Sequence, residues 1–153
     1  MLTNKIYETH VYTRDLNTAI EFYQKMGLTL AHTVEERKVS FFWMGDPDKK
    51  EQMLGVWEVP ADQWRSSHFA FHISIENMKK AMGWLKERGI PPREAFGKKA
   101  IEPIVHAWVP AASVYFRDLD GNSLEFLTTL PQEPKQELDM MYLSEWEKLH
   151  QSI

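Results

Sequence analysis

Histidine and carboxylate residues occur at alternating positions in three short segments of this sequence. Glu8 and His10 are two residues apart in the first segment, His68 opens the second, and Glu125 lies in the third. If each segment is a β-strand, residues two apart point to the same face, so donors from three strands of one concave sheet can converge. The chain has no cysteine, and imidazole and carboxylate are the ligands that Zn, Mn, Fe, Ni and Co accept when no thiolate is present. Three such ligands would leave coordination positions open for water and substrate, as catalysis requires.

Each of these residues also has a purely structural interpretation. A histidine in a strand is more often hydrogen-bonded in the core or at the rim than bound to a metal. Glu125 stands between Leu124 and Phe126, and a carboxylate inside such a strand must be paired, hydrated or metal-bound, because a bare buried charge is costly. Spacing alone therefore leaves both interpretations open.

The elements that must position these residues follow from hydrophobic periodicity. The first half is predicted to contain a strand at 6–13, a helix at 15–26 with Asp15 as its N-cap, and strands at 28–33, 39–44 and 52–59. After a polar connector at 60–67, the second half is predicted to contain a strand at 68–75, a helix at 77–88, and strands at about 94–96, 104–109, 113–117 and 123–128. Residues 118–121 have the composition of a hairpin turn.

The two halves are related by an internal repeat. A shift of 62 positions places Asn77 on Asp15 and Gly89 on Gly27, together with the apolar positions of both helices. Any two amphipathic helices share some of this pattern, but the shared order of strand, helix and glycine favours duplication. We therefore predict a single domain at 5–130, followed by a tail at 131–153 with a short helix near 143–149, in which Ser144 is the N-cap and Glu147 completes a capping box.

The bulk composition excludes several classes of function. The chain has 153 residues, 43% of them hydrophobic, which suffices for a packed core. Its formal net charge is −4, and its basic residues are scattered, so we expect no nucleic-acid partner. No apolar run approaches the roughly 20 residues of a membrane span, and the N-terminal residues do not have the pattern of a signal peptide. With the absence of cysteine, this leads us to expect a cytoplasmic protein without membrane partners.

Three segments resemble the vicinal oxygen chelate superfamily, which includes glyoxalases, bleomycin-resistance proteins and extradiol dioxygenases. Residues 6–28 (IYETHVYTRDLNTAIEFYQKMGL) resemble the first strand and helix of these proteins. Residues 68–78 (HFAFHISIENM) resemble the opening of their second module, and residues 115–128 (YFRDLDGNSLEFLT) resemble their closing hairpin. The hairpin motif is the most specific, although Leu119 replaces the usual proline.

The resemblance implies an α+β fold of two βαβββ modules, at about 5–60 and 67–129, which form a curved mixed sheet around a cleft with the helices on the outer face. It implies a divalent metal in that cleft, with His68 and Glu125 as ligands, and usually a homodimer. The family's first ligand is commonly a histidine seven residues before the helix-start Asp, and that position is Glu8 here. Either Glu8 or His10 could therefore be the first-strand ligand.

The resemblance also implies two classes of function. The first is a metal-dependent lyase, isomerase or dioxygenase that acts on a small oxygen-chelating substrate. Lyase chemistry needs a carboxylate base, for which Glu8 and Glu58 are the candidates, whereas a dioxygenase site of two histidines and one carboxylate would match His10, His68 and Glu125. The second is a non-catalytic protein, like the bleomycin-resistance proteins, that binds a small aromatic or cationic ligand.

Overall fold

The computed structural model describes residues 2–151, which form two compact units. The first unit comprises the chain up to Ser67 together with Asp118–Asn122, and the second comprises His68–Arg117 and the chain from Ser123 onward. No helix in the described part of the chain is both long and apolar enough to cross a membrane.

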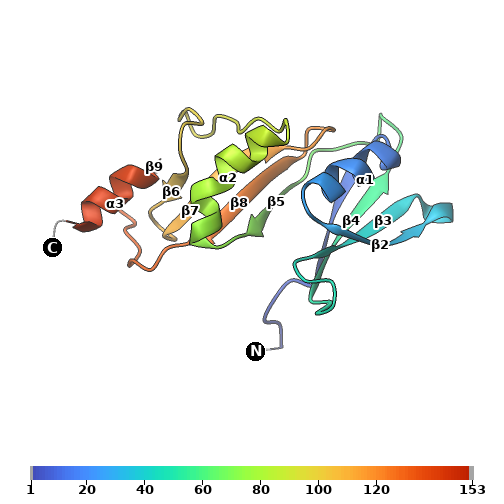
Figure 1. Ribbon diagram of the computed structural model, residues 1–153, viewed down its shortest axis with the longest axis horizontal. Coiled ribbons are helices and arrows are strands. Elements are labelled where there is room, and N and C mark those ends of the chain that lie inside the picture. Colours follow the sequence, from blue (N-terminus) through green and yellow to red (C-terminus); the bar gives the residue numbers. More distant parts are fainter. Residues whose placement is uncertain (1, 152–153) are drawn as a thin grey trace. The chain divides into compact units, whose positions relative to one another are not determined.

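The first unit is a four-stranded mixed sheet with one helix on one face (Figure 1). Its elements are β1 (Glu8–Thr13), α1 (Leu16–Lys25), β2 (Thr29–Val34), a 3-10 turn (Glu35–Arg37), β3 (Val39–Met44) and β4 (Gln52–Glu58). The strand order is β1-β4-β3-β2, with β1 parallel to β4 and the other pairs antiparallel. The side chain of Asp15 accepts a hydrogen bond from the Thr18 amide at 2.8 Å, so the predicted N-cap is confirmed.

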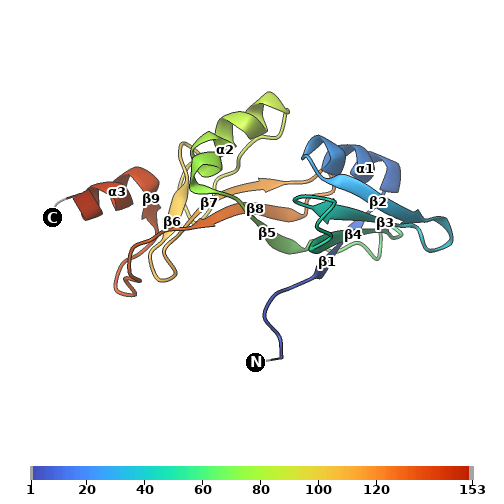
Figure 2. The same cartoon turned by 60° about the horizontal axis from the view of Figure 1, so that its bottom comes forward.

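The second unit repeats this plan with an added edge strand. Its elements are β5 (His68–His72), α2 (Ile75–Glu87), β6 (Ile104–His106), β7 (Ala111–Arg117), β8 (Ser123–Thr129), β9 (Met141–Tyr142) and α3 (Leu143–Gln151). The strand order is β5-β8-β7-β6-β9, and only the β5–β8 pair is parallel. Figure 2 shows α2 over one face of this sheet. The predicted α+β class with two repeated units is confirmed.

The helix starts differ from the sequence prediction in two places. Helix α2 begins at Ile75, because the Ser74 hydroxyl accepts from the amide of Asn77 at 3.2 Å and is the N-cap. The two repeat helices therefore coincide at their C-terminal glycines, Gly27 and Gly89, but α2 starts three residues earlier than the 62-residue shift predicts. Helix α3 already includes Ser144, so this residue is not the predicted N-cap.

The strand predicted at 94–96 is wrong. This segment contains an isolated bridge between Ala95 and Lys98 around a tight turn, in which Phe96 (φ 52°) and Gly97 (φ 71°) both have left-handed backbone conformations. Two consecutive positive φ values reverse the chain within two residues, so no strand can continue through them. The edge position beside β6 is taken by β9, which lies in the predicted tail.

Each sheet buries the face that its helix covers. In β1 the side chains of Val11 and Thr13 are buried, whereas those of Glu8, His10 and Tyr12 on the opposite face are exposed. The fully buried core of the first unit includes Tyr23, Phe42, Leu54, Val39, Val56 and Val11. The alternating burial fixes the register, because a slip of one residue would bring the polar face of β1 against the helix.

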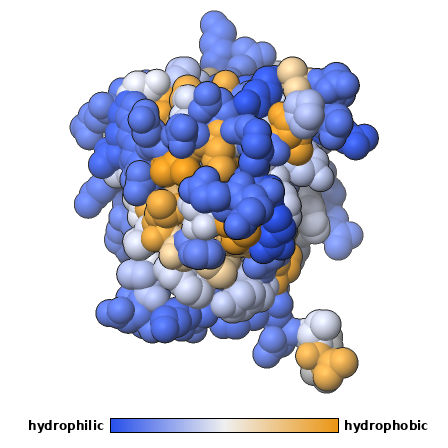
Figure 3. All heavy atoms as spheres, turned by 90° about the vertical axis from the view of Figure 1, so that its right-hand side faces the viewer, coloured by the Kyte–Doolittle hydropathy of each residue, from blue (hydrophilic) through white to orange (hydrophobic). Residues whose placement is uncertain are grey.

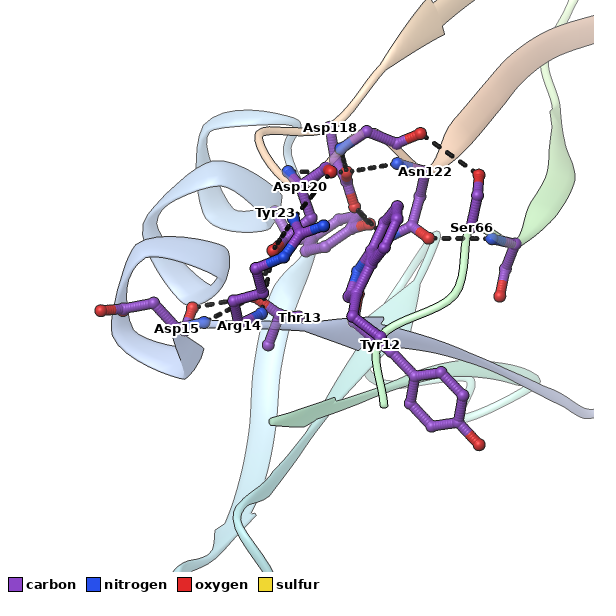
Figure 4. Close-up of polar contacts among 12 residues, drawn as sticks. Tyr12, Thr13, Arg14, Asp15, Tyr23, Ser66, Asp118, Asp120 and Asn122 are labelled. Carbon is purple, nitrogen blue, oxygen red and sulfur yellow. Dashed lines mark hydrogen bonds and ion pairs between the residues drawn. The ribbon is translucent and has the colours of Figure 1, made fainter. Parts of the chain in front are cut away.

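The turn Asp118–Asn122 belongs to the first unit through a network of hydrogen bonds (Figure 4). One oxygen of the Asp118 carboxylate accepts from the amides of Asp120, Gly121 and Asn122 at 2.8–3.1 Å. Its other oxygen accepts from the Tyr23 hydroxyl at 2.8 Å and from the Asn122 side chain at 2.7 Å. These five bonds give the DLDGN motif a structural function.

Candidate functional site

His68 and Glu125 lie on neighbouring parallel strands and face the same side of the second sheet. The β5–β8 register pairs His68 with Ser123 and Ala70 with Glu125, so the two side chains lie diagonally across the pair. The Nε2 atom of His68 is 3.2 Å from an oxygen of Glu125. The Glu125 side chain is only 7% exposed, whereas that of His68 is 52% exposed. The pair therefore has one buried member and one that solvent can reach.

The hydrogen bond at the other ring nitrogen identifies which nitrogen of His68 carries a proton. The Nδ1 atom is 3.0 Å from the carbonyl oxygen of Ser123. A carbonyl oxygen can only accept, so Nδ1 must be the N–H donor. In the neutral imidazole the lone pair is then on Nε2, only 3.2 Å from a carboxylate oxygen, and two electron-rich atoms this close are stabilised by a proton or a metal cation shared between them. A histidine that donates its other N–H to a backbone carbonyl is also the arrangement found at metal-bound histidines.

Polar side chains surround this pair on the same face. Tyr115 lies opposite Glu125 in the β7–β8 register, and its hydroxyl is 2.7 Å from Nε2 of His106. Burial and the negative charge of Glu125 raise the pKa of Tyr115 well above its usual value, so its hydroxyl keeps its proton at neutral pH. Burial lowers the pKa of His106, which favours its neutral form.

Arg93 supplies a cation beside this face. One terminal nitrogen of its guanidinium donates to the Ser123 hydroxyl at 2.7 Å, so Arg93 is joined through Ser123 to His68. Burial lowers the pKa of Arg93, and the neighbouring charge of Arg117 lowers it further. The Arg93 Nε atom is buried and has no hydrogen-bond partner within the described structure.

A small pocket of about 10 Å³, roughly the space of one water molecule, adjoins these residues within the second unit. It is lined by Met82, Pro92, Arg93, Ala100, Glu102, Ile104, Ser113, Val114 and Tyr115. Sequence reasoning missed Arg93, because its segment has neither helical nor strand periodicity and its spacing from Ser123 is visible only in three dimensions.

Glu8 and His10 form a second pair, in the first unit. The Nε2 atom of His10 is 2.5 Å from an oxygen of Glu8, and the two side chains are 38% and 37% exposed. The indole N–H of Trp57 donates to Nδ1 of His10 at 2.6 Å. The β1–β4 register pairs His10 with Gly55, directly beside the indole.

Glu58 lies on the opposite face of the first sheet from Glu8 and His10. It is paired with Thr13 in the β1–β4 register, and its carboxylate accepts from the Leu16 amide at 2.9 Å and from the Lys38 ammonium at 2.9 Å. The hydrogen bonds from Lys38 and Leu16 lower the pKa of Glu58. Glu58 thus provides a hydrogen-bond acceptor for the amide of Leu16, which is in the first turn of α1. Its carboxylate is engaged there and is not among the proposed catalytic residues.

The four predicted metal ligands therefore fall into two pairs, one in each unit. Among residues 2–151, no group of three or more histidine, aspartate or glutamate side chains is close enough to hold a metal ion. The donor chemistry of the His68–Glu125 pair nevertheless fits a divalent metal, because it offers an imidazole lone pair and a carboxylate oxygen side by side.

Comparisons with known proteins agree with this fold. The family model of the Glyoxalase/Bleomycin resistance protein/Dioxygenase superfamily matches residues 5–126, and the chain belongs to this superfamily. No curated protein matches the sequence.

Similar solved structures have low sequence identity and show the fold alone. One is a lactoylglutathione lyase from Agrobacterium tumefaciens, with 24% identity, a TM-score of 0.63, and coverage of 84% of this chain and 96% of that chain. Another is a glyoxalase/bleomycin resistance protein/dioxygenase from Nocardioides, with 22% identity, a TM-score of 0.62, and coverage of 91% and 92%. A third is an integron cassette protein from the metagenome of the Halifax Harbour sewage outfall, with 21% identity, a TM-score of 0.67, and coverage of 82% and 99%.

Proposed function

We propose that this chain is a metal-dependent enzyme of the superfamily that acts on a small oxygen-chelating substrate, and that His68 and Glu125 bind the metal. The observation that carries the proposal is that Nε2 of His68, whose Nδ1 donates to a carbonyl, lies 3.2 Å from an oxygen of the buried Glu125 carboxylate. Superfamily membership supports the same assignment. In the first unit, Glu8 and His10 are the candidate metal donors of the first strand.

The residues around the His68–Glu125 pair suggest how a substrate would be bound and how its developing charge would be stabilised. When bound, the metal would supply a Lewis acid that polarises the substrate oxygens. Arg93, with no carboxylate paired to it among the described residues, would attract an anionic group and hold it in place. The Tyr115 hydroxyl, which keeps its proton, would donate a hydrogen bond to a developing negative charge. Glu8 is the carboxylate proposed to move a proton in lyase or isomerase chemistry.

Metal analysis tests the proposal. Protein purified without a histidine tag and equilibrated with Zn²⁺ or Mn²⁺ should hold about one metal per chain, and the variants His68→Ala and Glu125→Gln should lose most of it. His72→Ala is the matched control, because His72 lies on the same strand and the same face but forms no described contact with Glu125. Metal content that is low in the wild type and unchanged in both variants would refute the proposal.

An activity screen then separates the reaction classes. Metal-loaded protein would be incubated with a methylglyoxal–thiol adduct for lyase chemistry and with catechols under oxygen for dioxygenase chemistry. The metal should be Fe²⁺ in the second case, because oxygen activation requires a redox-active ion.

A non-catalytic binding protein is the second candidate function. The observation that favours it is the row of half-buried aromatic side chains on the open face of the first sheet, where Phe41 and Trp57 pack around His10. On the face of the molecule shown in Figure 3, apolar side chains gather in small groups between polar ones. Quenching of tryptophan fluorescence by a planar aromatic cation, in protein that binds no metal, would favour this function over the first.

We also propose a homodimer, which the superfamily resemblance supports. Light scattering of the purified protein should give twice the mass of the 18.0 kDa chain. A monomer over the whole accessible concentration range would contradict this part of the proposal.

A further inference from the structure

We propose that His10 is a positioning residue that holds the Glu8 carboxylate in place and does not itself offer a lone pair to a metal. This inference rests on the proposed function in one respect only, namely that Glu8 has a ligand or a proton to receive. It removes the choice between Glu8 and His10 that the sequence leaves open.

The argument begins at the indole of Trp57. An indole N–H can donate but cannot accept, and it is 2.6 Å from Nδ1 of His10. The Nδ1 atom must therefore be the unprotonated acceptor, and the ring proton must be on Nε2. That proton points at the Glu8 oxygen 2.5 Å away. The chain of donors thus runs in one direction, from Trp57 through His10 to Glu8.

Both ring nitrogens of His10 are occupied in this arrangement. A metal at Nε2 would have to displace the proton while Nδ1 still accepts from Trp57, which would leave an imidazolate anion. His68 has the opposite tautomer, with Nδ1 as donor to a carbonyl and a free lone pair on Nε2. The two histidines therefore have different functions, although both lie on the first strand of a repeat.

The packing of the neighbouring strands holds the His10 ring in this position. His10 pairs with Gly55 across β1 and β4, and a Cβ atom at position 55 would lie 2.5 Å from Nδ1 of His10. Cβ atoms do not approach non-bonded atoms this closely, so any other residue at position 55 would displace the imidazole. The ring also packs edge-on against Phe41, with 6.1 Å between centroids. The absence of a side chain at Gly55 therefore leaves the space that the imidazole fills.

The result is a carboxylate with one restrained and one available oxygen. The first oxygen of Glu8 accepts from His10, and no hydrogen bond within the described structure reaches the second. A hydrogen bond from a neighbouring side chain that orients a ligand in this way typically changes metal affinity by about 10–100-fold when it is removed. His10 would thus act on the metal through Glu8.

Two variants at position 10 separate positioning from direct ligation. In His10→Gln, the side-chain amide can still donate to Glu8 and is a poor ligand for Zn²⁺, whereas His10→Ala removes the donor. We expect the alanine variant to bind Zn²⁺ about 10–100-fold more weakly in a chelator competition, and the glutamine variant to recover most of that loss. Equal losses in both variants would overturn the inference, because a direct ligand cannot be replaced by an amide.

The tautomer of His10 can be determined directly in the metal-free protein. Long-range ¹H–¹⁵N spectra of the metal-free protein should show the proton of His10 on Nε2, whereas Nδ1 of His68 should be protonated. The Trp57→Phe variant removes the donor to Nδ1 and should move part of the His10 population to the other tautomer, while His68 stays unchanged. A proton on Nδ1 of His10 in the wild type would overturn the inference.

The two readouts distinguish failure of this inference from failure of the proposed function. A chain that binds no metal but shows the expected tautomer at His10 would refute the metal-dependent function and still support the orientation of Glu8. A chain that binds metal through His68 and Glu125 but shows the opposite tautomer at His10 would support the metal-dependent function. It would refute the inference that His10 orients Glu8.

Discussion

The Asp118→Asn substitution would replace one carboxylate oxygen by an NH₂ group in a turn where that carboxylate accepts five hydrogen bonds. One carboxylate oxygen is kept as the amide oxygen and continues to accept from the three backbone amides. The other oxygen becomes an NH₂ group that faces two donors, the Tyr23 hydroxyl and the side-chain amide of Asn122. The substitution therefore converts two charge-assisted hydrogen bonds into donor–donor contacts.

The expected loss in the free energy of unfolding follows from these two hydrogen bonds. A hydrogen bond to a charged group contributes about 1.5–3 kcal/mol, so losing both would cost about 3–6 kcal/mol. The Tyr23 hydroxyl can rotate and accept from the new NH₂ group, which restores a neutral bond worth about 1 kcal/mol. Asn122 is fully buried and has no such alternative. We expect a net loss of about 3 kcal/mol in the free energy of unfolding.

Urea unfolding, followed by both circular dichroism and tryptophan fluorescence, measures this loss. Tyr23→Phe is the matched comparison, because it removes one of the two bonds and leaves the carboxylate with four donors, and we expect a loss of about 2 kcal/mol. The double variant should lose less than the sum of the two, since both substitutions remove the same bond. A loss below about 1 kcal/mol for Asp118→Asn would refute the assignment of the turn as a principal stabilising element of the first unit.

Three further substitutions test other parts of the structure. Gly55→Ala should destabilise the protein and displace the His10 ring, since the new Cβ would lie 2.5 Å from Nδ1; thermal unfolding and the His10 ¹⁵N signals would record this, and unchanged signals would contradict it. The hydrogen bonds to Glu58 lower its pKa, so they stabilise the fold above about pH 4.3 and are lost as the pH falls through the lower folded value. Glu58→Gln should consequently be less stable at neutral pH and lose less stability on acidification, and parallel pH profiles would refute this role. Lys50 has a φ of 50° and is exposed, so Lys50→Gly should stabilise the protein by about 0.5–1 kcal/mol, whereas Lys49→Gly, which lacks a positive φ, should give no gain in urea unfolding.

The fold was largely predictable because it depends on local and periodic signals. The apolar spacing of both helices, the Asp15 cap and the glycines that end the helices identify the repeated unit before any contact is known. The errors lie where local signals are weak. Phe96 has a backbone conformation that its residue type disfavours, and Ser74 caps α2 although Asn77, three residues later, is an equally suitable residue type.

The residue types that could bind a metal, and the strands on which they lie, follow from the pattern of the sequence. It could not assign roles to them, because two histidines on equivalent strands look alike in one dimension. Only the tertiary structure distinguishes them, since the role of an imidazole is decided by what its second nitrogen contacts. At His68 that contact is a carbonyl on the neighbouring strand, which leaves a lone pair free. At His10 it is the N–H of Trp57, 47 residues away in the chain, which takes that lone pair.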